Sequence, residues 1–544
     1  MVNQPPPLSG YNLFSADAAL VEGLEWNGAD WANERVDELG RLAGTEEAIA
    51  WGFQANANPP VLRTHDRYGR RIDEVEFHPA WHRLMEVAVD RGLHAMPWRD
   101  PRPGAHVARA ASFYVWSQVE AGHGCPISMT YAIVPALRGT PALATAWEPG
   151  LTSLSYDFGL RPATLKSGLL AGMAMTEKQG GSDVRANTTR ADPMDGGSSA
   201  GEYRLTGHKW FCSAPMCDVF LVLAQAPGGL SCFLLPRVLP DGSRNAFHIQ
   251  RLKDKLGNRS NASSEVEFEG AWAQLVGPEG RGVRTILEMV NHTRLDCIIG
   301  SAALMRQAVA QATHHIAHRS AFGRLLKDQP LMRNVVADLA LESEAATTVM
   351  LRVARAYDLA GSNEREAAFR RLATAVTKYW VCKRTPMVTA EAVECLGGNG
   401  YVEESITPRL YREAPLNSIW EGSGNVIALD ALRAMEREPE SVEAFRGELA
   451  RAAGMDAAYD AGLRALEDDL MRGKIAEENA RRLVERMAVM LQASLLLQHA
   501  PSSVSAAFCA SRLGDRGGMA FGTLPADVDF KAIIERSTPE GVSR

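Results

Sequence analysis

The segment Ala174–Ala186 combines groups that could hold a flat or anionic ligand. Thr176 and Ser182 carry hydroxyls, and Gly180 and Gly181 lie between them, all within seven positions. Glycines let the backbone approach a ligand closely, and free N–H and O–H groups can then bond to it. Taken alone, the run is also typical of an ordinary β-turn. The segment is therefore one candidate binding loop.

A second candidate group is the carboxylate of Glu421, in the segment Asn417–Asn425, where an aromatic residue precedes it and glycines follow. A carboxylate in an apolar, water-poor pocket has a raised pKa and is suited to removing a proton. A lone buried glutamate is more often held in a salt bridge, and Arg294 could be the partner here. The residues by themselves leave both interpretations open.

A further patterned run is Glu394–Tyr401, followed by Glu404, Arg409 and Glu413. Together with Ala174–Ala186 it resembles the paired signatures of the acyl-CoA dehydrogenase flavoproteins, and both patterns are met without a gap. The resemblance spans roughly residues 60–435. It implies FAD as the cofactor and an acyl-CoA thioester as the substrate.

The resemblance assigns cofactor contacts to the first segment. Backbone and hydroxyl groups at Met175 and Thr176 would bond the pyrimidine edge of the isoalloxazine ring. Ser182, which follows Gly181, would face the pyrophosphate. No G-x-G-x-x-G follows a strand, so the chain has no Rossmann loop. The glycine cluster 397–400 would instead pack near the adenosine half of the cofactor.

The run Gly207–Ser213 resembles the family's next flavin contact. Phe211 would pack on the flavin and the hydroxyl of Ser213 would bond near N5, with Cys212 between them. The family usually has tryptophan at the aromatic position. Phe211 is therefore a departure, because phenylalanine stacks similarly but cannot donate a hydrogen bond.

The run Arg319–Gly323 resembles an element that reaches the FAD of a neighbouring subunit, which implies a homo-oligomer and, by resemblance, a tetramer. The guanidinium of Arg319 suits a pyrophosphate through bidentate bonds, and Phe322 belongs to the same element. The alternative is a solvated arginine at the end of a helix.

For Glu421 the resemblance implies the catalytic base, which takes the α-proton while flavin N5 takes a hydride from the β-carbon. Trp420 stands where the family often has a smaller aromatic residue, so a narrowed acyl pocket and weak or vestigial dehydrogenation are expected. The neighbours expected to contact the cofactor are Ile419, Trp420, Gly422, Ser423, Gly424 and Asn425.

A narrower resemblance runs nearly from end to end. The proline-rich opening, Phe77–His82, Arg251–Ser263 and the C-terminal extension look like the alkylation-response branch of the family, which is associated with double-stranded DNA and protection from alkylating agents. It implies non-specific binding of double-stranded DNA, since neither a zinc finger nor a sequence-reading helix-turn-helix is evident. The alternative is an ordinary catabolic acyl-CoA dehydrogenase with a structural C-terminal extension and no DNA role.

The DNA contact would lie near the C-terminus. Residues 441–544 hold 13 Lys and Arg against 15 Asp and Glu, but residues 472–516 hold seven basic against four acidic. Phosphate neutralisation needs only several aligned cations, and a solvated helix face is the alternative. The predicted contacts are Arg433, Arg437, Arg481, Arg482, Arg486, Arg512 and Arg516, with Arg472 and Lys474 in the same run.

Composition bounds the remaining possibilities. A net charge of −7 gives no global attraction to nucleic acid or to an anionic membrane. The eight cysteines are scattered without C-x-x-C spacing, which is typical of reduced thiols in a cytoplasmic protein. No signal peptide is apparent, and the most apolar run, Met487–Leu497, is too short to span a bilayer. His314, His315 and His318 lack a carboxylate companion, so no metal site is expected.

Hydrophobic periodicity places these residues on elements. Helices are predicted at Pro79–Arg91, Val107–Ala121, Arg284–His318 and Leu331–Leu359, and short β-runs with a turn at Pro227–Gly229 fill the region between residues 172 and 282. The acidic stretch Glu436–Ser441 is predicted to be a linker.

At 544 residues the chain exceeds one ordinary core. We predict a mainly α protein with a small, mostly antiparallel β-domain, like the acyl-CoA dehydrogenases. The predicted domains are an N-terminal helical domain (1–170), the β-domain (171–282), a four-helix-bundle-like α-domain (283–436) and a C-terminal helical extension (437–544) that could bind DNA.

Overall fold

The computed structural model describes residues 3–194, 201–471 and 475–539. The chain forms two compact units that do not follow sequence order. The first consists of Met1–Ile49, Arg102–Val119 and Arg294–Arg544, and the second of Ala50–Pro101 and Glu120–Thr293. The four predicted domains remain a prediction, whereas the fold class, mainly helical with one β-domain, is confirmed.

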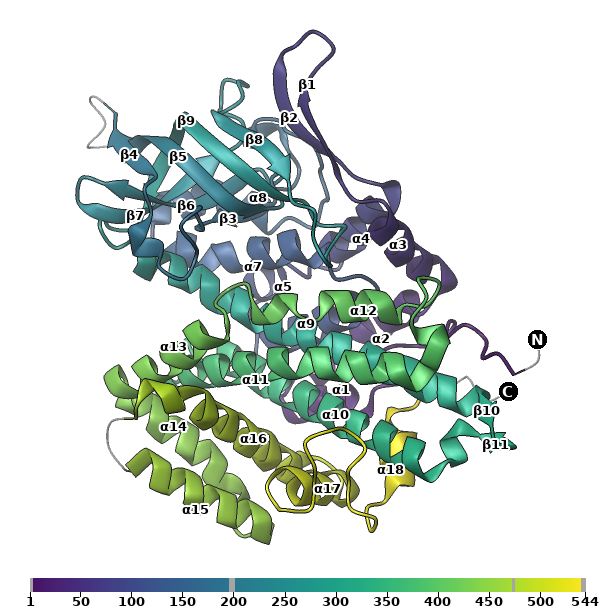
Figure 1. The fold of residues 1–544 in the computed structure, drawn as a ribbon. Coiled ribbons are helices and arrows are strands. Elements are labelled where there is room, and N and C mark those ends of the chain that lie inside the picture. The colour runs from purple at the N-terminus through teal and green to yellow at the C-terminus, as the bar shows by residue number, and fades with distance from the viewer. Residues whose placement is uncertain (1–2, 195–200, 472–474, 540–544) are drawn as a thin grey trace. The chain divides into compact units, whose positions relative to one another are not determined.

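The second unit is built on a β-sheet (Figure 1). Strands β6, β4, β5, β9 and β7 are neighbours in that order, and β7 also pairs with β6, so the sheet closes on itself. Most pairings are antiparallel, as predicted, while β6 pairs in parallel with β3 and β4. The strands are β3 (Ala171–Ala174), β4 (Arg190–Pro193), β5 (Glu202–Ser213), β6 (Val219–Ala226), β7 (Gly229–Pro236), β8 (Phe247–Leu252) and β9 (Ser263–Val276).

The turn predicted at Pro227–Gly229 is confirmed, because β6 ends at Ala226 and β7 begins at Gly229. The hydroxyl of Thr130 accepts a hydrogen bond from the Ala171 N–H, which ties the start of β3 to a helix of the same unit. The helices of this unit are α4 (Pro79–Asp90), α5 (Met96–Arg99), α7 (Gly124–Arg138) and α8 (Pro141–Leu151). Periodicity missed one hairpin, β1 (Val61–His65) with β2 (Arg71–Glu76), in the region predicted to be helical.

The first unit is a set of packed helices. Its core contains α6, whose side chains are buried along the whole helix, and the long helices α10 and α11. The predictions at Arg284–His318 and Leu331–Leu359 are confirmed by α9, which begins in the other unit, and by α10. The helices are α1 (Ala18–Trp26), α2 (Asn33–Ala43), α3 (Glu46–Ala57, shared with the other unit), α6 (Ala105–Ser117), α9 (Gly282–His318), α10 (Pro330–Leu359), α11 (Glu364–Leu396), α12 (Thr407–Glu413) and α13 (Gly424–Arg437).

The C-terminal helices pack beside α10 and α11 in the same unit (Figure 1). They are α14 (Pro439–Leu449), α15 (Ala457–Met471), α16 (Ala480–His499), α17 (Ser502–Arg512) and α18 (Phe530–Ser537). The linker predicted at Glu436–Ser441 is wrong, because only Glu438 separates α13 from α14. Its carboxylate accepts a hydrogen bond from Arg371 on α11, and Ser441 is buried. Charge and proline indicated a linker here, whereas proline at the first position of a helix starts α14.

Candidate functional site

One buried carboxylate organises the loop that follows β3. Glu177 is fully buried and accepts hydrogen bonds from the backbone N–H groups and hydroxyls of Thr188 and Thr189. Its fifth donor is the Nζ of Lys209 on β5, at 2.8 Å. Burial opposes ionisation, but the Lys209 charge and these bonds lower the pKa of Glu177 to about 2. The carboxylate therefore ties both arms of the loop to the sheet.

The groups predicted to bind a cofactor lie on this anchored loop. Met175 and Thr176 are half-buried, whereas Gly181 and Ser182 are exposed. The carbonyl of Met175 accepts a hydrogen bond from Asn187 Nδ2 at 2.9 Å. A Cβ at Gly181 would lie 2.6 Å from the Thr176 hydroxyl, which is closer than any contact allows. Glycine at this position keeps the hydroxyl accessible.

Strand β5 presents the predicted aromatic residue on an irregular stretch. The pairing of β5 with β9 shifts register between Lys209 and Cys212, and Phe211 in this bulge is 54% exposed. The Ser213 hydroxyl is hydrogen-bonded to the Ser263 hydroxyl at 3.1 Å. An exposed ring beside hydroxyls and an open glycine turn fits a flat ring system with a polar edge, such as isoalloxazine.

Cys212 is one of the predicted cofactor contacts, but its side chain does not reach the surface. Its side chain is fully buried in the β-domain, and burial raises the pKa of the thiol to about 12. The Cys212 carbonyl accepts a hydrogen bond from Ser264 inside the sheet. The thiol is thus a neutral core group, and any contact of Cys212 with the cofactor would come from its backbone.

Glu421 lies in the irregular stretch between α12 and α13, and its backbone has φ = +58°. This left-handed conformation is rare outside glycine. Ile419 is 61% exposed, and the indole N–H of Trp420 donates to Asn417 Oδ1 at 2.8 Å. Gly422 also has a positive φ, of +110°, and a Cβ there would lie 2.9 Å from the side chain of Ile427.

The contact expected between Arg294 and Glu421 takes another form. Arg294 Nε donates to the backbone carbonyl of Glu421 at 3.0 Å. The other end of the guanidinium pairs with Asp430, 2.9 Å away on α13. The segment has a second cation that sequence did not reveal, Lys378 on α11, which donates to the carbonyls of Trp420 and Gly422. No sequence pattern pointed to Lys378, because a lysine in a long helix is usually a solvent-facing residue.

The Arg319 element forms a hairpin of β10 (Ser320–Ala321) and β11 (Arg324–Leu325). Phe322 and Gly323 at its tip both have positive φ, and Phe322 is 98% exposed. The guanidinium of Arg319 donates to the carbonyl of Asn3, and the Asn3 side chain accepts from the Ser320 N–H at 2.7 Å. Sequence reasoning missed this role of the N-terminal segment.

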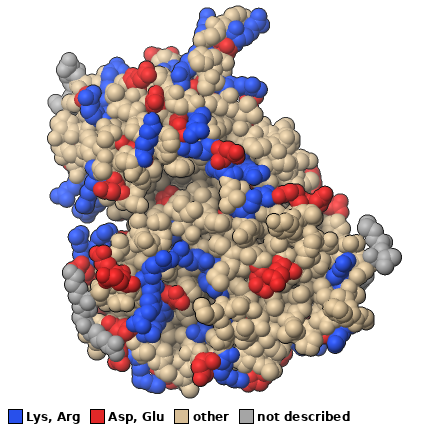
Figure 2. Space-filling view, in the orientation of Figure 1, with Lys and Arg blue, Asp and Glu red and all other residues tan. Residues whose placement is uncertain are grey.

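Several predicted DNA contacts are exposed on α13 and α16. The side chains of Arg433 and Arg482 are 56% and 69% exposed, and each lies 3.9 Å from an aspartate. Arg437 and Arg481 are also exposed, and Arg481 donates to the Tyr379 hydroxyl at 3.0 Å. Figure 2 shows basic side chains gathered over this part of the first unit, with acidic groups beside them.

The other predicted contacts differ from this group. Arg486 is half-buried and paired with Asp469, and Arg516 forms an exposed pair with Asp527. Arg472 and Lys474 lie outside the described residues.

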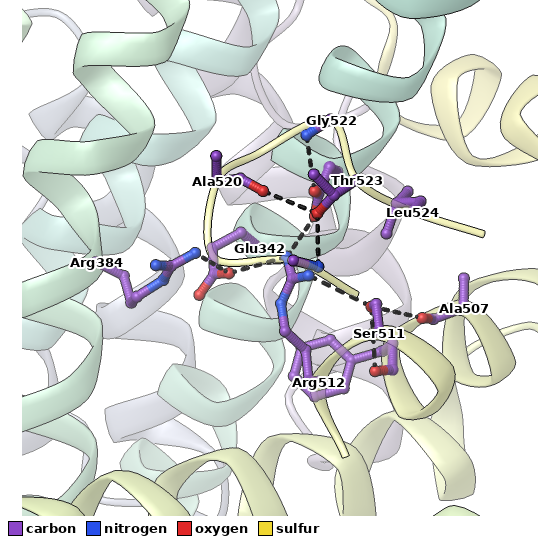
Figure 3. Close-up of polar contacts among 12 residues, drawn as sticks. Glu342, Arg384, Ala507, Ser511, Arg512, Ala520, Gly522, Thr523 and Leu524 are labelled. Atoms are coloured by element: carbon purple, nitrogen blue, oxygen red, sulfur yellow. Dashed lines mark hydrogen bonds and ion pairs between the residues drawn. The ribbon is translucent and has the colours of Figure 1, made fainter. Parts of the chain in front are cut away.

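Arg512 belongs to an ion cluster whose carboxylates are buried (Figure 3). Its guanidinium pairs with Asp338 and Glu342 on α10, and Glu342 also pairs with Arg384 on α11. The backbone N–H of Gly522 donates to Asp338 as well, so the loop after α17 is held by the same carboxylate. The charge of Arg512 is therefore paired inside the fold, and its contact with DNA stays a prediction that these ion pairs do not favour.

Neither a metal centre nor a transmembrane helix is found in the described parts of the chain. Among residues 3–194, 201–471 and 475–539 no three His, Cys, Asp or Glu side chains gather as metal ligands. Within the same ranges no helix is long and apolar enough to cross a membrane. His314 is hydrogen-bonded to the carbonyl of Pro6, at 2.7 Å, which accounts for one of the clustered histidines.

Comparison with known proteins covers the chain in three parts. Residues 3–158 match the adaptive response protein AidB N-terminal domain, residues 172–271 the acyl-CoA dehydrogenase middle domain, and residues 280–436 the acyl-CoA dehydrogenase C-terminal domain. AidB of Escherichia coli (strain K12) is 47% identical over 95% of both chains. The structure of Caenorhabditis elegans ACDH-11 in complex with C11-CoA has a TM-score of 0.83 at 27% identity, covering 98% of this chain and 92% of that one.

A third structure, an acyl-CoA dehydrogenase from Bacillus anthracis complexed with FAD, shares the fold with a TM-score of 0.60 at 19% identity. It covers 79% of this chain and 77% of that one.

Replacing Lys209 by methionine should weaken the loop after β3. The substitution leaves the Glu177 carboxylate buried without its cation, which costs about 3–5 kcal/mol in other proteins. We expect the ratio of flavin to protein absorbance after purification to fall severalfold. Arg190→Ala removes an exposed cation nearby on β4 and should leave the ratio unchanged. Full flavin content in Lys209→Met would contradict the anchoring role.

Replacing Arg512 by alanine should destabilise the first unit. It leaves Asp338 and Glu342 buried with less compensation, at a cost of about 3–5 kcal/mol. Arg516→Ala, which breaks an exposed pair, should cost at most about 1 kcal/mol. Thermal unfolding of the two variants measures the difference, and equal transition temperatures would show that the cluster is not a stabilising contact.

Proposed function

We propose that this chain, which belongs to the acyl-CoA dehydrogenase family and uses FAD, removes hydrogen from the α and β carbons of an acyl-CoA thioester. Membership in the family is established by the 47% identity to AidB over 95% of both chains. The class of substrate follows the C11-CoA bound to the Caenorhabditis elegans relative. FAD, when bound, supplies the two-electron oxidant of this reaction.

The observation that carries the proposal is the geometry of Glu421. A half-buried carboxylate follows the aromatic residue Trp420 and precedes Gly422, on a backbone held in the left-handed conformation. A base that abstracts a carbon-bound proton must hold its carboxylate at a fixed place within hydrogen-bond reach of that proton. We assign Glu421 this role, with the α-proton passing to its carboxylate.

The cofactor contacts follow from exposure and hydrogen bonding. On the β-domain we propose Met175, Thr176, Gly181, Ser182, Phe211 and Ser213 as cofactor contacts. The family resemblance proposes Ile419, Trp420 and the run Gly422–Asn425 as further contacts. The hydrogen bond to Asn417 fixes the indole ring of Trp420. A large, fixed ring beside the proposed acyl-binding site would narrow the range of acyl groups that fit, which favours weak dehydrogenation of common substrates.

Glu421→Gln should abolish flavin reduction by acyl-CoA. Glutamine cannot accept the α-proton, so the rate of anaerobic bleaching should fall by about 10²-fold or more. A panel of acyl-CoA thioesters of different chain length and branching is mixed with the wild type, Glu421→Gln and Glu436→Gln. Glu436 is an exposed glutamate on α13 and serves as the matched control. If no thioester bleaches the wild-type flavin, the proposed activity is refuted.

We also propose non-specific binding of double-stranded DNA and a role in the response to DNA alkylation. Support comes from the similarity to AidB and from the match to the adaptive response N-terminal domain. Arg433 and Arg437 lie one turn apart on α13, which packs on α16, where Arg481 and Arg482 begin the helix. Such a cluster can neutralise several phosphates without reading base edges. Arg486 and Arg516 would contribute at its margin.

Arg481/Arg482→Ala should weaken retention on duplex DNA about equally for unrelated sequences. The slope of log K against log salt should become shallower by about one to two units, because fewer counterions are released. Arg63→Ala, on the exposed hairpin of the second unit, is the control and should leave the slope unchanged. Binding that responds to neither salt nor these substitutions would exclude this surface.

The oligomeric state and the compartment are part of the same proposal. We propose a homotetramer, which is supported by the 98% exposed Phe322 and by Leu331 and Tyr401, which are 82% and 83% exposed. Large apolar side chains in such numbers on one unit usually meet a partner. We place the protein in the cytoplasm, and sedimentation equilibrium of the purified protein measures its mass.

A further inference from the structure

Three successive backbone carbonyls around Glu421 each accept a hydrogen bond from a cation. Lys378 Nζ donates to the carbonyl of Trp420 at 2.9 Å and to that of Gly422 at 2.6 Å. Arg294 Nε donates to the carbonyl between them, that of Glu421. These carbonyls lie where the chain leaves a helical turn and has not yet started α13, so no regular ladder bonds them. The two cations replace that ladder.

The conformation they hold carries a cost that the fold must offset. A non-glycine residue in the left-handed region is disfavoured by about 1 kcal/mol or more, because its Cβ crowds the following carbonyl. Turning the Glu421 backbone to an ordinary φ would re-aim its side chain and rotate the peptide groups on both sides. Those peptide groups contain the Trp420 carbonyl, which Lys378 binds, and the Glu421 carbonyl, which Arg294 binds.

Both cations are themselves held in place. Lys378 is 1% exposed, and it extends from the middle of the long helix α11. Arg294 is paired with Asp430 on α13, and Arg371 of α11 binds the same carboxylate at 3.0 Å. Helices α9, α11 and α13 are thereby joined by one charge network that surrounds the Glu421 segment.

The charges of Lys378 and Glu421 both affect the pKa of one buried thiol, that of Cys297. Burial raises the pKa of Cys297 on α9 well above its usual value, the positive charge of Lys378 lowers it, and the negative charge of Glu421 raises it. Both groups therefore lie within electrostatic range of Cys297.

We propose that Lys378 and Arg294 are positioning residues that hold the Glu421 backbone in its left-handed conformation and so give its carboxylate a single direction. The inference rests on the proposed role of Glu421 as the base. Neither residue exchanges a proton with substrate. Lys378 binds the carbonyl of the peptide group before Glu421, and Arg294 binds the carbonyl of the peptide group after it. Lys378 also binds the next carbonyl, that of Gly422, so the two cations together restrain rotation of both peptide groups that adjoin the base.

The kinetic test uses the FAD-loaded full chain. Lys378→Met keeps the length of the side chain and removes the donor. A base that is displaced by an ångström or so slows proton transfer about 10- to 100-fold, whereas ground-state binding is little affected. We expect the rate of flavin reduction by the best acyl-CoA to fall by that factor, with the acyl-CoA dissociation constant and the flavin content within twofold of wild type.

Lys166→Met is the matched control, since it removes another buried lysine, one that pairs with Asp218 in the second unit. It should lower thermal stability and leave both the rate of flavin reduction and the acyl-CoA dissociation constant within twofold of wild type. Arg294→Lys, which keeps the charge beside Asp430 and loses the Nε donor, should reproduce the split if Lys378→Met does not fold. An unchanged reduction rate in both variants overturns the proposal, as does a loss of flavin that accounts for the whole effect.

A second measurement does not depend on catalysis. Glycine adopts the left-handed region without strain, so Glu421→Gly removes the strain that the cations offset. Lys378→Met should then lower the thermal transition temperature less in the Glu421→Gly background than in the wild type. Additive effects would refute the positioning role. Lys166→Met, which removes a lysine that pairs with Asp218 in the second unit, should lower the transition temperature equally in the two backgrounds. If the wild type reduces no thioester, the proposed function fails and this cycle still decides the inference.

Discussion

Buried charges hold irregular backbone in both segments that carry the candidate chemistry. Where a chain leaves a helix or strand, its N–H and C=O groups still need partners, and leaving them buried without one is costly. In the β-domain the Glu177 carboxylate gathers the N–H groups of Thr188 and Thr189. In the helical unit Lys378 gathers two carbonyls. The negative Glu177 accepts hydrogen bonds from N–H groups, and the positive Lys378 donates hydrogen bonds to carbonyl oxygens.

This arrangement explains how the proposed cofactor loop can be both exposed and fixed. Gly181, Ser182 and Phe211 are exposed, and the groups that anchor them, Glu177 and Lys209, are buried in the sheet. Glu421 is half-buried, and Arg294 donates a hydrogen bond to its backbone carbonyl. Restraints that act through peptide groups and neighbouring residues can fix such a segment and leave exposed side chains accessible.

The arginines near the C-terminus fall into two groups, those exposed to solvent and those that pair with carboxylates inside the fold. Arg433, Arg437, Arg481 and Arg482 are exposed on α13 and α16. Arg512, in the same stretch of sequence, forms ion pairs with Asp338 and Glu342. That cluster joins the C-terminal helices to α10, and both belong to the same compact unit. A count of basic residues in a sequence cannot separate these two uses of arginine.

Local pattern in the sequence determined the helices such as α9 and α10, the turn between β6 and β7, the mainly α class with a β-domain, the family and its cofactor. Each depends on neighbours along the chain, because periodicity and motif spacing are local properties. Tertiary structure alone decided that Arg294 binds a carbonyl and pairs with Asp430, that Lys378 faces inward, and that Arg512 pairs with two buried carboxylates. Those outcomes depend on which distant helices meet, and the partner of a charged side chain is settled by burial and geometry that no short stretch of sequence encodes.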